Sequence, residues 1–96
     1  MALDTTVWDV AEHLQDEAAI AAYIEAVLED GDPGLVAAAI GDVARARGMA
    51  QIAQETGRSR ESLYRALSEK GNPQLDTLIG VLKALGLRLS VKPASA

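Results

Sequence analysis

Cysteine is absent from this 96-residue sequence, which excludes disulfide bonds, thiolate chemistry and any metal site that needs a cysteine ligand. Histidine occurs once, at His13, so a site built from several histidines is excluded as well. Aromatic residues make up only 3% of the chain, so the core must be aliphatic and rich in alanine, as in closely packed helices. We therefore expect an all-α fold with no metal and no cofactor.

Long apolar runs are also missing. The longest uncharged stretch, residues 33–41, has nine residues and is too short to cross a bilayer. The sequence begins Met-Ala-Leu-Asp, without the basic residues that open an export signal. With 49% hydrophobic and 24% charged residues, the chain is expected to form a single cytoplasmic domain over residues 1–96.

Basic residues are absent from positions 1–42, although this segment holds ten acidic residues. Positions 43–96 hold nine basic and four acidic residues, and the whole chain has a net charge of −5. This separation of charge predicts two partners of opposite charge or one strongly dipolar surface. The alternative is a chance distribution of charges that only solvate helix faces.

The spacing of apolar residues predicts five or six short helices. The first, over residues 8–14, carries Trp8 and Leu14 on one face. Helix-capping residues predict a second helix over 17–30, and a third from Asp32-Pro33 to about residue 47 that buries Leu35. Shorter helices are expected over 49–56 and 59–69. A sixth, over 74–85, is expected to bury Leu75, Leu78, Ile79, Leu82 and Leu85.

The C-terminal segment 87–92 alternates strictly between apolar and polar residues, which predicts a β-strand. No other segment has a strand pattern, so this strand lacks a partner within its own molecule. We expect it to pair with the same strand of a second copy, giving a homodimer with an interface at Leu87, Leu89 and Val91. The expected domain thus has acidic helices over 1–47, a helix-turn-helix over 49–69, and a helix and strand over 74–92.

Residues 50–67 have the spacing of a helix-turn-helix. Ala53 lets the two helices cross closely, Gly57 makes the turn, and Leu63 anchors the second helix to the core. The alternative is a hairpin of helices with a merely solvated polar face. In the helix-turn-helix interpretation, the second helix offers groups for phosphates and base edges, and the predicted DNA-binding residues are Ser59, Arg60, Glu61, Tyr64, Arg65 and Ser68.

Seven stretches follow a known family pattern, with the Gly48-Met49 start and the Gly-Asn-Pro loop at 71–73 as the most distinctive parts; the stretches are 8–14, 23–33, 39–49, 52–57, 59–68, 71–73 and 82–87. Through them the chain resembles the addiction-module antidote proteins, HigA-like antitoxins with a Cro/C1-type helix-turn-helix. The resemblance implies a homodimeric repressor that binds operator DNA, a near-palindrome, and neutralises a RelE/HigB-type toxin encoded beside it. Arg58 and Met49 depart from the broader Cro/C1 pattern, in which an aliphatic residue and a glutamine are usual.

RelE-type toxins bind RNA and are expected, through this resemblance, to be basic. The acidic segment suits such a surface, and Glu25, Glu29 and Asp30 are the predicted toxin-binding residues. The alternative function is an acidic protein-interaction module that does not bind DNA. An enzyme is not expected, because neighbouring acids on a helix do not face each other and no phosphate-loop, metalloprotease or nucleophile motif occurs.

Overall fold

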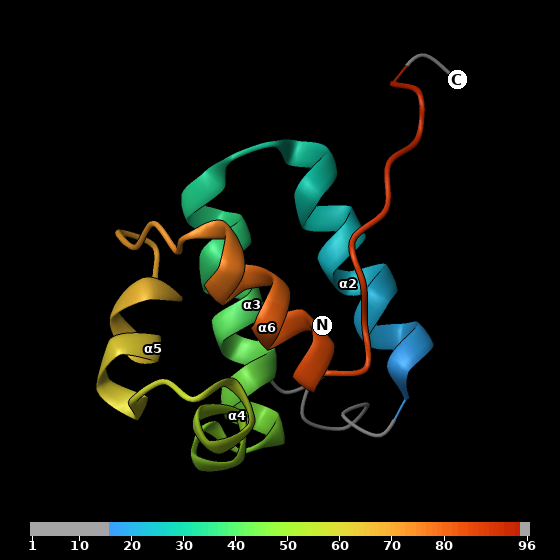
Figure 1. Ribbon diagram of the computed structural model, residues 1–96. Helices are drawn as coiled ribbons and strands as arrows, with labels where there is room; N and C mark the ends of the chain where they lie inside the picture. Colours follow the sequence, from blue (N-terminus) through green and yellow to red (C-terminus); the bar gives the residue numbers. More distant parts are fainter. Residues whose placement is uncertain (1–15, 95–96) are drawn as a thin grey trace, which may run out of the picture.

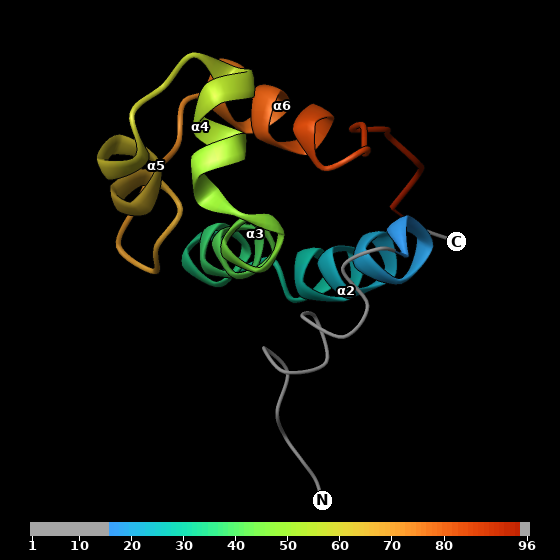
Figure 2. The same ribbon diagram turned by 90° about the horizontal axis from the view of Figure 1, so that it is seen from below.

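A computed structural model describes residues 16–94 and contains five α-helices in that range. They are α2 (Glu17–Asp30), α3 (Pro33–Arg47), α4 (Met49–Thr56), α5 (Arg60–Ala66) and α6 (Leu75–Ala84). α2 and α3 form an antiparallel hairpin, α4 and α6 pack over one side of it, and α5 lies at the far edge of α3 from α2 (Figures 1 and 2). The all-α expectation is thus confirmed for this range, and the helix expected over 8–14 lies outside it.

Local capping residues explain where the helices begin and end. Asp16 precedes α2 and accepts a hydrogen bond from the N–H of the residue three positions on, at 3.2 Å. Asp32 caps α3 by accepting a hydrogen bond from the N–H of Gly34 at 3.0 Å, with Pro33 as the first helical residue. Gly31 ends α2 with a φ of 82°, a left-handed conformation that favours glycine. The expected bounds of α2, α3 and α4 are confirmed, whereas α5 and α6 are shorter than expected.

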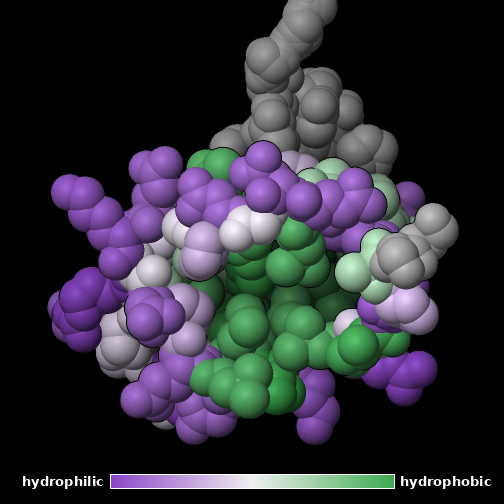
Figure 3. Space-filling model, turned by 90° about the horizontal axis from the view of Figure 1, so that it is seen from above, coloured by the Kyte–Doolittle hydropathy of each residue, from purple (hydrophilic) through white to green (hydrophobic). Residues whose placement is uncertain are grey.

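One aliphatic core joins all five helices. Its buried members are Ile20, Ile24, Ile40, Val43, Ala44, Met49, Ile52, Ala53, Leu63, Leu67, Val81, Leu82 and Leu85. The expected burial of Leu35, Leu75 and Ile79 is wrong, because their exposed fractions are 40%, 65% and 43%. α6 instead turns Thr77 and Val81 toward the core. Figure 3 shows hydrophobic residues gathered along α6 and in a hollow between α6 and the α2–α3 hairpin.

Two glycines of α3, two helical turns apart, let the chain after α5 approach very closely. A Cβ atom on Gly34 would overlap the carbonyl oxygen of Glu69, and one on Gly41 would overlap that of Leu67. The backbone of residues 67–69 therefore rests directly on α3. Since α5 ends at Ala66, this contact fixes the position of α5 relative to the rest of the bundle.

The β-strand expected over 87–92 is absent, and this correction has a physical cause. The segment is extended but runs alongside α2 (Figure 1), where the side chain of Leu87 packs against the core. Its first N–H, that of Leu87, donates to the carbonyl of Leu82 at 2.8 Å and so closes the end of α6. A strand needs the backbone of a second strand, and residues 16–94 of one chain offer none. Of the three alternating apolar residues only Leu87 packs against the core, whereas Leu89 and Val91 are 47% and 96% exposed.

Candidate nucleic-acid interface

The pair α4–α5 is built around a tight turn at residues 57–59. Gly57 ends α4 with a φ of 71°, and the N–H of Arg58 donates to the carbonyl of Ala53 at 3.1 Å. Ser59 then starts α5 by accepting a hydrogen bond from the N–H of Ser62 at 3.1 Å. Leu63, which is fully buried, anchors α5. The opposite face of α5 is consequently held at the surface of the molecule.

The structure separates the six predicted DNA-binding residues into two groups. Arg60, Glu61, Tyr64 and Arg65 are exposed on α5. The side chains of Ser59 and Ser68 form hydrogen bonds with the backbone at the two ends of α5. Ser59 caps its start, and the hydroxyl of Ser68 donates to the carbonyl of Arg65 at 2.9 Å. The exposed group therefore carries the side chains that are best placed to meet a ligand.

Tyr64 has a neighbour from another helix that the sequence did not reveal. The guanidinium carbon of Arg45, in the last turn of α3, lies 5.9 Å from the centre of the Tyr64 ring. Arg45 also forms an ion pair with Asp42 at 2.7 Å. A cation–π contact of this length holds the ring and the guanidinium side by side. α3 thus brings a guanidinium group, itself paired with Asp42, to the outer face of α5.

A shallow polar hollow of about 500 Å³ lies beside the C-terminal half of α5. Arg58, Arg65 and Lys70 give it positive charge, and Ser62, Asn72 and Gln74 add hydrogen-bonding groups. Arg58 is oriented by an ion pair with Asp76 at 3.0 Å, which ties the turn before α5 to the first turn of α6. Cations and amides around a solvent-filled hollow suit a phosphodiester oxygen.

Arg45, Arg58 and Lys70 extend the candidate interface beyond the predicted residues. The sequence did carry a signal for them, since all three belong to the basic half of the chain. It did not show which basic residues come together around α5. Arg58 and its partner Asp76 are 18 positions apart in the sequence, and Arg45 reaches Tyr64 from α3. The fold supplies that information.

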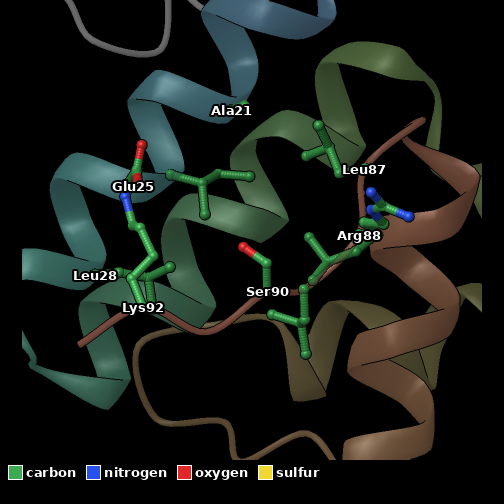
Figure 4. A pocket seen from close by; sticks show the side chains of 10 residues that line it. Ala21, Glu25, Leu28, Leu87, Arg88, Ser90 and Lys92 are labelled. Carbon is green, nitrogen blue, oxygen red and sulfur yellow. Dashed lines mark hydrogen bonds and ion pairs between the residues drawn. The ribbon is translucent and has the colours of Figure 1, made fainter. Parts of the chain in front are cut away.

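The predicted toxin-binding residues lie on the other side of the molecule. Glu25, Glu29 and Asp30 are exposed on α2, which is separated from α5 by α3 (Figures 1 and 2). Glu25 already forms an ion pair within the chain, because Lys92 Nζ lies 2.8 Å from its carboxylate (Figure 4). The hydrogen bond and the charge of Lys92 lower the pKa of Glu25 below its ordinary value, and the same contact raises the pKa of Lys92. Glu29 and Asp30 form no ion pair within the range that the structure describes.

An apolar groove of about 240 Å³ runs between α2 and the C-terminal segment. Leu28, Leu87 and Leu89 line it, and the Glu25–Lys92 ion pair closes one end (Figure 4).

None of the helices between residues 16 and 94 has the length and apolar character that crossing a bilayer demands. The same residues contain no cluster of three or more His, Asp or Glu side chains that could hold a metal ion.

The bundle of short helices thus carries basic residues around α5 on one side and the acidic helix α2 on the other (Figure 2). The chain belongs to the family of probable addiction module antidote proteins, whose model matches residues 4–93. It is also 48% identical over 85 residues to a protein of Haemophilus influenzae described only as uncharacterized, covering 88% of each chain. No solved structure matches. An antidote family implies a non-enzymatic protein with a cognate toxin as its partner.

Proposed function

We propose that this antidote protein binds operator DNA through α5, represses its own operon and neutralises a RelE/HigB-type toxin encoded beside it. The observation that carries the proposal is the convergence of positive charge on one exposed helix. Arg60 and Arg65 project from α5, and Arg45, Arg58 and Lys70 surround it from three other segments. The net charge of the whole chain is negative, so this clustering concentrates the basic half where DNA can reach it.

In this proposal α4–α5 is a Cro/C1-type helix-turn-helix, and α5 enters the major groove. Arg60 and Arg65 reach guanine edges, Tyr64 contacts the sugar–phosphate backbone, and Glu61 accepts from a cytosine amino group. The hydroxyl hydrogen of Ser59 remains available for a phosphate oxygen, whereas that of Ser68 is used by Arg65. Arg58 and Lys70 hold phosphates beside the groove. A homodimer sets two α5 helices about 34 Å apart, which requires a near-palindromic operator.

The antitoxin part of the proposal assigns the acidic helix α2 to the toxin. A toxin that binds RNA presents a basic surface, and α2 has four acidic residues and no basic one. Glu25, Glu29 and Asp30 are exposed and can cover such a surface. Both activities place the protein in the cytoplasm, where the DNA and the RNA targets of the toxin are found.

A mobility-shift titration with the DNA upstream of the gene tests the DNA-binding part. We expect affinity to fall with salt with a log–log slope of about −0.9 per phosphate contact, and unrelated DNA to bind much more weakly. An acidic interaction module without DNA binding is the second candidate, favoured by the uninterrupted negative charge of α2. Neutralisation of the toxin by a chain that does not shift its upstream DNA at low salt establishes that candidate.

A further inference from the structure

α6 presents an apolar face that the described part of the chain, residues 16–94, leaves exposed. Leu75 and Ile79 lie one helical turn apart on the same side of α6, and 65% and 43% of their surfaces are exposed. The opposite side of α6, with Thr77, Val81 and Leu85, supplies the core. Together with the hydrophobic hollow beside them (Figure 3), these two side chains form a continuous apolar surface of the kind found at protein contacts.

The charges beside these two residues indicate what the partner is. Asp76 and Lys83 are both exposed and share the outer face of α6, three residues before and four residues after Ile79. One carboxylate oxygen of Asp76 accepts a hydrogen bond from Arg58 at 3.0 Å, and the other accepts only a long one from the hydroxyl of Thr77 at 3.5 Å. Lys83 forms no ion pair with the residues that the structure describes. One face therefore carries a negative and a positive charge at nearly equal distances from an aliphatic centre.

We propose that this face of α6 packs against the same face of a second copy of the chain. A two-fold axis near Ile79 runs the two α6 helices antiparallel, and Asp76 then lies level with Lys83 of the partner subunit. The two-fold axis then creates two equivalent pairs of Asp76 with Lys83 of the partner subunit, while the aliphatic residues pack together at the axis. A surface that is complementary to itself in charge and apolar at its centre is what an isologous contact requires.

The surroundings of α6 are suited to this contact. The hydrophobic surface along α6 continues into the hollow beside the α2–α3 hairpin (Figure 3), so a second copy can bury more than two side chains of apolar surface. α5 lies at the side of that view, and two copies joined along α6 therefore leave both α5 helices exposed. The C-terminal segment is less suited, because Leu87 already packs against its own core and only Leu89 and Val91 stay exposed.

This inference rests on the homodimer within the proposed function and names its surface. Sedimentation of the full chain without DNA tests it. We expect the parent to be a dimer and the Ile79→Asp variant to associate at least about tenfold more weakly, because an unpaired charge is placed in the seam. Lys83→Glu should weaken the dimer by setting two acids together, and the Asp76→Lys/Lys83→Glu double variant should restore it. Leu89→Asp is the matched control and should remain dimeric.

A monomeric parent overturns the inference. So does a dimer whose association is unchanged by Ile79→Asp, or one that dissociates on Leu89→Asp. Far-UV circular dichroism checks that each variant keeps its helices; because the substituted side chains are exposed, we expect all of them to fold. Failure of the proposed function is distinguishable from these results. A dimer that depends on Ile79 but does not shift DNA supports the α6 contact and overturns only the repressor proposal.

Discussion

The carbonyl oxygen of Leu67 lies against the Cα atom of Gly41, so close that a methyl group on Gly41 would overlap it. Gly34 has the same relation to Glu69, and the two contacts seat the chain that leaves α5 on the surface of α3. Gly41 has no positive φ and is buried within a helix. Its lack of a side chain therefore serves packing, and backbone freedom is not the reason for it.

Gly41→Ala is expected to lower the free energy of unfolding by about 1–3 kcal/mol, because either Leu67 or α3 must move to admit the methyl group. Urea unfolding followed by circular dichroism measures this. Gly80→Ala is the control, since the nearest atom to its new Cβ is a Thr56 methyl at an ordinary 3.6 Å. That variant should be unchanged or more stable by about 0.5–1 kcal/mol, from the better helix propensity of alanine. Equal effects of both substitutions contradict the close contact.

Arg60→Ala and Arg65→Ala are each expected to weaken operator binding by about 1–3 kcal/mol if the arginine contacts a guanine edge. The matched control is Arg88→Ala, which removes an exposed arginine from the groove between α2 and the C-terminal segment (Figure 4). That groove is separated from α5 by α3 and α6 (Figure 1). Fluorescence anisotropy with an operator duplex gives the affinities. Parental binding by both α5 variants would show that α5 does not read the DNA.

Lys70→Ala should act differently, because Lys70 belongs to the polar hollow beside α5. Loss of a phosphate contact weakens binding to specific and unrelated DNA alike and reduces the steepness of the salt dependence by about 1. Titrations at several salt concentrations measure both quantities. A variant that relaxes the sequence preference at an unchanged salt slope contradicts the assignment of Lys70 to a phosphate.

The double variant Glu29→Lys/Asp30→Lys should slow association with the toxin by about tenfold or more, since complementary charge raises association rates and like charge opposes them. Glu25 is left in place to keep its ion pair with Lys92. A control with the same change in net charge, Glu55→Lys/Glu69→Lys, alters exposed residues outside α2. Equal association rates for the two double variants would remove α2 from the toxin interface.

The contact between Glu25 and Lys92 also predicts a pH dependence. Lys92 lowers the pKa of Glu25 below the ordinary 4.5, so the contact contributes fully above about pH 4.5 and is lost as the pH falls through the lowered value. NMR titration of the Glu25 carboxyl should show this pKa, and Lys92→Ala should return it toward 4.5. Arg88→Ala should leave it unchanged. A Glu25 carboxyl that titrates identically with and without the Lys92 side chain contradicts the ion pair.

The sequence predicted α2, α3 and α4 to the residue, because Asp16, Gly31, Asp32 and Gly48 are local signals that act within one helical turn. It predicted the exposed face of α5 from the helical spacing of the apolar residues that hold this helix to the core. It did not predict which face of α6 is buried, since apolar residues occur on both sides and only the neighbouring helices decide between them. The expected strand failed because an alternating segment forms a strand only where a second strand pairs with it, and residues 16–94 contain no such strand.

α3 has a role beyond packing, because it stands between the two charged surfaces. The basic residues around α5 lie on one side and the acidic helix α2 on the other (Figure 2), so the proposed DNA and toxin surfaces do not overlap. Under the proposed function, one molecule is expected to bind DNA and toxin together in a ternary complex. Any effect of the toxin on repression would then arise because the bound toxin lies near the DNA and changes its affinity through charge or steric contact. Competition between toxin and DNA for one site would not contribute.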